Sequence, residues 1–330
     1  MNFDNYFQTC RNSVYRSDTK EFLLSRFLLS DQEKDLSVPP NCEGYGRVRH
    51  FKRFIAENWG LDPLPIDPAI KALKLPDTDL IEAQVFQIAS CNVNCWYCFV
   101  PDALKHANET TSKWFSASEM IELFCKDNNC IKVIDLSGGN PELVPEWILE
   151  TMKALIKKNL QDKVYLWSDD TLTTDYTFKY LKKDEINFFK SYKNYGKVCC
   201  FKGFDAHSFS FNTKLPMELF YLQFENFAKY LELGLDLYAY VTFTTDNAEY
   251  LDDKIGAFID KLIKCHPLLP LRTVPLKISI FTPVKARLTP QHEISLNNQQ
   301  LVHNEWKKQL KMRYSAVQLN TRIPDVSLYD

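Results

Sequence analysis

The sequence has no long apolar run and no excess of charge of one sign. Its 330 residues contain no stretch of about 18 apolar residues, the length that suggests a membrane-spanning helix. The first residues, Met1 to Asn5, lack the charged and then apolar order of a signal peptide. Forty basic and 42 acidic residues give a net charge of −2, which excludes a global basic field for nucleic acid or anionic membranes. These absences predict a soluble cytoplasmic protein with no membrane partner and no nucleic-acid partner.

The most informative motif is a set of three cysteines that lacks a fourth. Cys91, Cys95 and Cys98 stand at C-x3-C-x2-C spacing, and in a reducing cytosol such clustering indicates metal ligands. Three thiolates can hold three irons of a [4Fe–4S] cluster and leave the fourth iron open to a bound molecule. The same cysteines with His106 also fit a structural Cys3His zinc site. The cysteines by themselves leave both sites open.

The chain after about residue 80 alternates between short apolar runs and amphipathic stretches. Helices are predicted to begin at 116–119 and to cover 145–160, 217–233 and 251–264. Six such β-α units predict a parallel sheet, either an open doubly wound sheet or a partial barrel. The predicted strands cover 84–89, 131–136, 163–167, 198–202, 237–243 and 276–281.

Polar motifs follow four consecutive predicted strands. The cysteine motif follows the first strand, and in parallel α/β folds the carboxyl ends of the strands form the site. We therefore expect all four motifs to face one mouth. The other three motifs are Ser137-Gly138-Gly139-Asn140-Pro141, Ser168-Asp169-Asp170 and Lys202-Gly203-Phe204-Asp205.

With these motifs in place, the chain resembles the radical S-adenosylmethionine (SAM) superfamily. The resemblance rests on the cysteine motif with an aromatic residue, Tyr97, directly before the third cysteine, and it spans roughly residues 83 to 283. It implies a partial (β/α)6 TIM-like barrel that binds one [4Fe–4S] cluster and SAM. It also implies reductive cleavage of SAM to methionine and a 5′-deoxyadenosyl radical, which abstracts hydrogen from a substrate.

The resemblance also implies which residues contact SAM. The segment 137–141 resembles the glycine-rich stretch that binds the SAM amino group, although a glutamate is commoner where Asn140 stands. The segment 201–207 resembles the lysine-x-x-aspartate-x-histidine stretch of glycyl-radical activating enzymes such as pyruvate formate-lyase activating enzyme. The implied metal ligands are Cys91, Cys95 and Cys98, and the implied SAM contacts are Tyr97, Ser137, Gly138, Gly139, Asn140, Ser168, Asp169, Lys202 and Asp205.

The rest of the chain frames this core. We expect a proline-rich N-terminal extension over 1–80, the core over 81–285, and a C-terminal helix and tail over 286–330 that help cover the barrel. No cysteine follows Cys265, so a single cluster is predicted. Expected partners are an electron donor such as flavodoxin or ferredoxin and a small-molecule, peptide or protein substrate. The alternatives are an activase that installs a glycyl radical on a partner protein, and a non-catalytic iron–sulfur or zinc protein.

Overall fold

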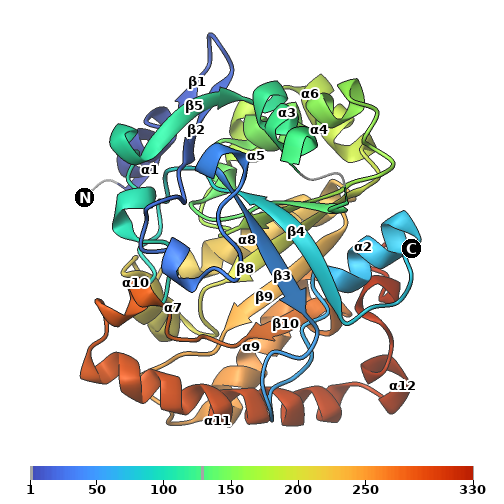
Figure 1. The fold of residues 1–330 in the computed structure, drawn as a ribbon. Coiled ribbons are helices and arrows are strands. Elements are labelled where there is room, and N and C mark those ends of the chain that lie inside the picture. Colours follow the sequence, from blue (N-terminus) through green and yellow to red (C-terminus); the bar gives the residue numbers. More distant parts are fainter. Residues whose placement is uncertain (1–2, 128–129, 330) are drawn as a thin grey trace.

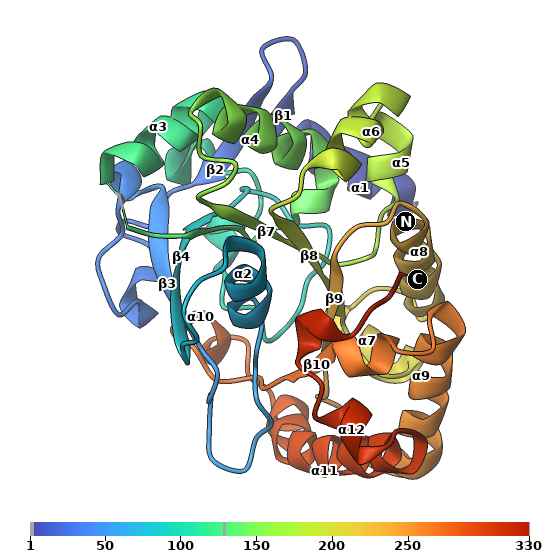
Figure 2. The same ribbon diagram turned by 90° about the vertical axis from the view of Figure 1, so that its right-hand side faces the viewer.

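The computed structural model describes residues 3–127 and 130–329, and its centre is a curled seven-stranded sheet (Figures 1 and 2). β3 pairs antiparallel with β4, and every other neighbouring pair in this sheet is parallel. The parallel strands lie in chain order without the reversal of a doubly wound sheet, which confirms the partial barrel. The strands are β3 (Gly46–Lys52), β4 (Leu80–Phe86), β6 (Val133–Leu136), β7 (Tyr165–Asp170), β8 (Tyr195–Phe201), β9 (Leu237–Thr242) and β10 (Thr273–Leu276).

Helices connect the parallel strands. The predicted capping box is confirmed, since the Ser116 backbone N–H donates to Glu119 Oε2 at 2.8 Å and the Glu119 N–H donates to Ser116 Oγ at 3.3 Å. The other predicted helices also form, within a few residues of their expected ends. The connecting helices are α3 (Ala117–Asp127), α4 (Pro145–Lys157), α5 (Tyr176–Tyr180), α6 (Lys183–Ser191), α7 (Ala206–Thr213), α8 (Leu219–Glu232) and α9 (Leu251–Cys265).

The last predicted strand, 276–281, is wrong. The strand β10 ends at Leu276, and the apolar run after it is a loop. The backbone of Ile278 pairs with a side chain instead of a strand: its N–H donates to Gln299 Oε1 at 3.0 Å, and its carbonyl accepts from Gln299 Nε2 at 3.1 Å. A side-chain amide that satisfies both backbone groups removes the need for a further sheet ladder.

The two faces of the sheet bury different cores. On the convex face, residues such as Ile134, Leu166 and Val241 pack beneath the connecting helices. On the concave face, α2 (Ile66–Leu73) lies against the curled sheet (Figure 2). The concave core contains Ile66, Ala69, Ile70, Ile81, Ala83, Val133, Tyr165, Trp167, Val198, Cys200, Tyr238, Tyr240, Val274 and Ile323.

The terminal segments pack around this core. No described helix has both the length and the apolar composition that a bilayer crossing requires. In Figure 1 the long helix α11 lies along the lower side of the molecule, and the small antiparallel sheet lies at the top. The small sheet has the order β1 (Tyr15–Arg16), β2 (Glu21–Ser25) and β5 (Ser112–Ser116), and the remaining helices are α1 (Phe3–Asn12), α10 (Thr282–Lys285), α11 (Pro290–Arg313) and α12 (Ala316–Leu319).

Candidate active site

The concave face changes from apolar to polar toward the carboxyl ends of the parallel strands. Side chains alternate between the two faces of a strand, so residues two positions beyond the apolar concave residues return to the same face. This alternation brings Asp135, Asp169, Lys202 and Thr242 to the concave side. The strand-end residues therefore surround one region next to the loop that follows β4.

That loop carries the three cysteines. Cys95 is buried, and Cys91 and Cys98 are partly exposed. The loop is fixed by its backbone: the Cys91 N–H donates to the Lys105 carbonyl at 3.1 Å, and the Cys98 N–H donates to the Cys95 carbonyl at 3.2 Å. The C-terminal segment also holds it, because the Arg287 guanidinium donates to the Cys98 carbonyl at 2.6 Å.

The electrostatics of the loop fit a metal cluster. Burial, together with the neighbouring thiolates of Cys95 and Cys98, raises the pKa of Cys91 to about 12. Burial likewise raises the pKa of Cys95, whereas the Lys202 ammonium opposes that rise. Thiolates that interact so closely are stabilised by a cation, and a metal that binds them displaces their protons.

The zinc alternative finds no support in the geometry. Across residues 3–127 and 130–329, no three or more His, Cys, Asp or Glu side chains gather as ligands of one metal ion. The His106 ring Nδ1 hydrogen-bonds with the Asp102 carbonyl at 2.9 Å. A cubane cluster spreads its thiolates over three irons, so it does not require them to meet at one point.

The two aromatic residues before Cys98 fix the loop to the barrel. The Tyr97 hydroxyl hydrogen-bonds with Thr242 Oγ1 at 3.0 Å, which links the loop to the end of β9. The Trp96 indole N–H donates to Asn212 Oδ1 at 3.0 Å, and its ring stacks on His292 with the ring centroids 4.3 Å apart. Tyr97 is buried, and its predicted contact with SAM stays a prediction.

The glycine-rich loop after β6 packs directly on the cysteine loop. Gly138 and Gly139 have φ values of +90° and +65°, and a Cβ on Gly139 would lie 2.2 Å from the Ile88 carbonyl oxygen. The Asn140 N–H donates to the Ser90 carbonyl at 2.8 Å. Only glycine permits this conformation and this close approach without strain.

This loop also leaves polar atoms without a protein partner. Asn140 is fully buried and its side-chain Nδ2 donates to Asn92 Oδ1 at 2.7 Å, but Asn140 Oδ1 has no partner. Gln87 Oε1, next to Gly138, is also buried and unpartnered. Buried acceptors without donors fit a ligand that carries an ammonium group, as SAM does.

Three further predicted residues come together on the concave face. The Ser137 hydroxyl donates to Asp169 Oδ2 at 2.5 Å. Burial lowers the pKa of Lys202, but its coupling to the acidic groups of Cys200, Tyr97, Cys95 and Asp169 raises that pKa well above its usual value. Lys202 therefore stays protonated and supplies a positive charge between the cysteine loop and the ends of β7 and β8.

Two predicted residues lie elsewhere. Ser168 is on the convex face, where its hydroxyl hydrogen-bonds with the Tyr195 hydroxyl at 2.7 Å. Asp205 caps α7, because its Oδ1 accepts from the Ser208 N–H at 2.6 Å. No observation tests a SAM contact for either residue, so both contacts stay predictions.

The structure also shows charged residues that the motifs did not indicate. Arg47 and Arg49 follow the alternation from Phe51 on β3 and face the concave side, near Asp135. On the convex side, Lys197 forms fully buried ion pairs with Glu142 and with Asp170, the latter at 3.5 Å. Along each strand, the apolar residues show which alternate positions face the concave side. That alternation could have separated the concave charged residues from the convex ones before the structure was known.

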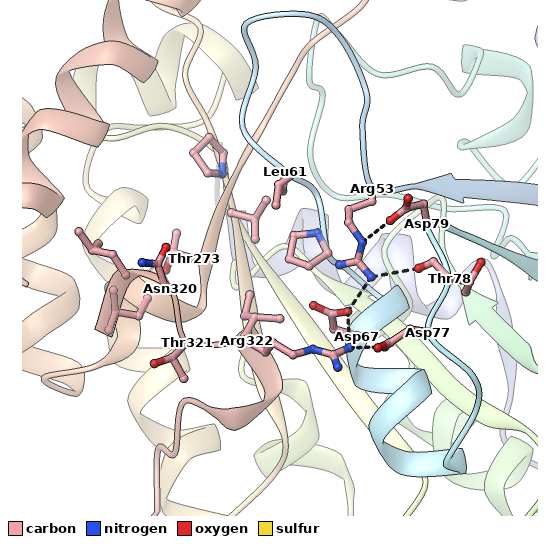
Figure 3. A pocket seen from close by; sticks show the side chains of 16 residues that line it. Arg53, Leu61, Asp67, Asp77, Thr78, Asp79, Thr273, Asn320, Thr321 and Arg322 are labelled. Atoms are coloured by element: carbon pink, nitrogen blue, oxygen red, sulfur yellow. Dashed lines mark hydrogen bonds and ion pairs between the residues drawn. The ribbon is translucent and has the colours of Figure 1, made fainter. Parts of the chain in front are cut away.

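A hollow of about 710 Å³ lies at the opposite end of the strands (Figure 3). Its charged side chains are ion-paired with one another: Arg53 pairs with Asp67 and Asp79, and Arg322 pairs with Asp67 and Asp77. Parallel α/β folds place their chemistry at the carboxyl ends of the strands, and this hollow is at the amino ends. It is therefore separate from the candidate active site.

Comparisons with known proteins agree with a cluster domain. Residues 82–202 match a family model described as a 4Fe-4S single cluster domain, which confirms the predicted [4Fe–4S] cofactor. The residues that hold the cluster remain a prediction. A search of curated protein sequences finds no match.

Similar solved structures include SuiB of Streptococcus suis bound to SAM, at 13% identity and a TM-score of 0.47, with 70% of this chain and 48% of that chain covered. SuiB bound to the precursor peptide SuiA is 14% identical, with a TM-score of 0.38 and coverage of 55% and 36%. A polyhistidine-tagged anSMEcpe with bound AdoMet is 16% identical, with a TM-score of 0.35 and coverage of 54% and 44%. The chain thus spans less than half the length of these structures.

Proposed function

We propose that this protein is a radical SAM enzyme with a single [4Fe–4S] cluster on Cys91, Cys95 and Cys98. The proposal rests on one observation: residues from separate strands and loops lie together on the concave face of the sheet. Tyr97 from the cysteine loop and Lys202 after β8 lie beside Cys95, and Asp169 on β7, which accepts from Ser137 after β6, lies near Lys202. With cluster and SAM bound, one electron yields methionine and a 5′-deoxyadenosyl radical that abstracts hydrogen from a substrate.

The side chains position the two ends of SAM. Asn140 Oδ1 is a buried acceptor without a partner and is available to the SAM ammonium group. Lys202 is a protonated donor beside Cys95, suited to the SAM carboxylate or to the ribose oxygens. The Ser137 hydroxyl donates to Asp169 Oδ2 at 2.5 Å, and this hydrogen bond fixes the Asp169 carboxylate near Lys202. Burial of these groups keeps water away from the reacting carbon.

The partners follow from this chemistry. The reaction requires an external one-electron donor, such as flavodoxin or ferredoxin, and a substrate whose C–H bond reaches the radical. The Arg287 contact with the cysteine loop couples the C-terminal segment to the cluster. We propose that this segment closes the loop side of the site.

Anaerobic reconstitution tests the proposal. We expect about four irons and four sulfides per chain, and a reduced-cluster electron paramagnetic resonance spectrum that changes when SAM is added. One zinc and no iron would instead show a zinc protein and overturn the proposal.

Cysteine variants provide the residue-level test. Cys91→Ala, Cys95→Ala and Cys98→Ala should each abolish SAM cleavage, because each removes an iron ligand. Cys265→Ala is the matched control, since Cys265 lies at the end of α9 and its thiol contacts the Phe224 carbonyl at 3.7 Å. Equal loss of cleavage in all four variants would show that the assigned ligands are wrong.

A further inference from the structure

Arg47 is a buried cation that lacks a counter-ion. Its residue surface is 5% exposed, and its Nε has no hydrogen-bond partner. Among the described residues, no carboxylate lies within ion-pair distance of its guanidinium. The guanidinium instead lies over two aromatic rings, with its Cζ 5.1 Å from the Phe99 centroid and 5.7 Å from the Phe27 centroid.

The neighbouring charges do not replace that counter-ion. Asp135 pairs with Arg49, whose guanidinium nitrogen lies 3.4 Å from Asp135 Oδ2. Asp169 accepts from Ser137, and its charge and that of Asp135 act on Arg47 only from beyond ion-pair distance. Burial and the positive charge of Arg49 lower the pKa of Arg47 to about 9, so the site as it stands disfavours the charge.

A buried guanidinium of this kind is suited to an anion. Its planar donors match the paired oxygens of a carboxylate or a phosphate, and a bound anion removes the cost of burying the charge. Phe99 directly follows Cys98, so an anion held by Arg47 lies against the cysteine loop.

We propose that Arg47 binds an anionic group of the substrate, with two oxygens that its guanidinium can contact together. This inference rests on the proposed radical SAM function. The alternative source of such oxygens is SAM itself, because the predicted SAM contacts include Asp169, whose charge acts on Arg47. Arg47 lies on β3, the edge strand next to β4, whereas the predicted SAM contacts lie on β7 or follow β4, β6 and β8. We therefore assign the anion to the substrate, and the SAM affinity measured below decides between the two sources.

The test uses the reconstituted, SAM-loaded protein with acetate and inorganic phosphate as separate probes. Thermal unfolding is followed against probe concentration for the wild type, Arg47→Gln and Arg53→Gln. Arg53 is the matched control, because it directly follows β3 but lies at the opposite end of the strand among Asp67 and Asp79. At least one probe should raise the unfolding temperature of the wild type and of Arg53→Gln, and this rise should saturate. The probe concentration that gives half of the rise should be about tenfold higher or more for Arg47→Gln.

SAM affinity, measured by equilibrium dialysis, separates the two sources of the anion. We expect Arg47→Gln to bind SAM within about twofold of the wild type. A tenfold or greater loss of SAM affinity would assign Arg47 to the SAM carboxylate and overturn the inference. So would a wild type that responds to neither probe, or an Arg47→Gln variant that responds like the wild type.

An Arg47→Lys variant and the wild-type cluster assays distinguish a failure of the Arg47 proposal from a failure of the radical SAM proposal. If Arg47→Gln does not fold, Arg47→Lys keeps the charge but loses the paired geometry, and it should weaken probe binding several-fold. An unchanged midpoint in Arg47→Lys would then contradict paired recognition. Failure of the proposed function appears elsewhere, as a wild-type protein that binds no cluster or does not cleave SAM.

Discussion

Replacement of Gly139 by alanine should disrupt the active site, whereas the same change at Gly234 should only lower stability. Both residues have positive φ, +65° at Gly139 and +76° at Gly234. The left-handed conformation costs a residue with a Cβ about 1–2 kcal/mol, so both variants share this cost. The surroundings differ: a Cβ at Gly234 has no heavy atom within 4 Å.

At Gly139 the added methyl group collides with the backbone of the cysteine loop. It would lie 2.2 Å from the Ile88 carbonyl oxygen and 2.5 Å from the Ser90 carbonyl oxygen. These distances are about 1 Å shorter than a normal contact, and backbone oxygens cannot move aside as a flexible side chain can. Because Ser90 directly precedes Cys91, the collision displaces the first cysteine of the motif.

Iron content and SAM affinity of the two variants provide the comparison. A displacement of about 1 Å at a reacting centre can reduce a rate about 100-fold, so Gly139→Ala should lose SAM cleavage by about that factor and retain less iron. Gly234→Ala should retain iron and SAM affinity while it loses about 1 kcal/mol of unfolding free energy in urea. If the two variants bind iron and SAM equally well, the loop contact does not position the cysteines.

Three other predictions follow from single side chains. Arg287→Gln removes donors to the Cys98 and Val100 carbonyls, at 2.6 and 2.8 Å, so iron should be lost to a chelator about tenfold faster than from the wild type. Burial and the charge of Asp169 raise the pKa of Asp135 to about 7, so its ionisation destabilises the fold progressively as the pH rises above about 4. Asp135→Asn should therefore gain stability relative to the wild type between about pH 5 and 8, by up to roughly 4 kcal/mol, and a pH-independent difference in urea unfolding would contradict this. Lys197→Met leaves buried carboxylates without a counter-charge and should lose about 3–5 kcal/mol, whereas a loss below about 1 kcal/mol would show that the ion pairs contribute little.

The sequence predicted the parallel strands and their loops because apolar periodicity determines which residues are buried. β6 and the helices α4, α8 and α9 follow that periodicity closely. The run 276–281 does not form a strand, because an apolar loop and a buried strand share one sequence pattern. The hydrogen bonds between Ile278 and Gln299 decide between them, and they join residues that are 21 positions apart.

The site was predicted less completely because a motif does not state which face a residue occupies. Ser168 and Asp169 are neighbours on β7, so only one of them can face the concave side. Asp169 does, and Ser168 contacts Tyr195 beneath the helices. Arg47 belongs to no motif, and its strand pairs with β4 only in the folded chain.

Two sets of buried groups, one on each face of the sheet, differ in their partners. On the convex face, Glu142 accepts from Lys197, from the Thr177 hydroxyl at 2.7 Å and from the Tyr230 hydroxyl at 2.8 Å. On the concave face, Arg47 Nε, Asp135 Oδ1 and Asn140 Oδ1 have no partner. Each unsatisfied buried group costs about 1–3 kcal/mol, and a fold retains such groups where a ligand supplies the missing contact. The Glu142 network is therefore satisfied within the protein, whereas the three concave atoms are those that the proposed ligands would contact.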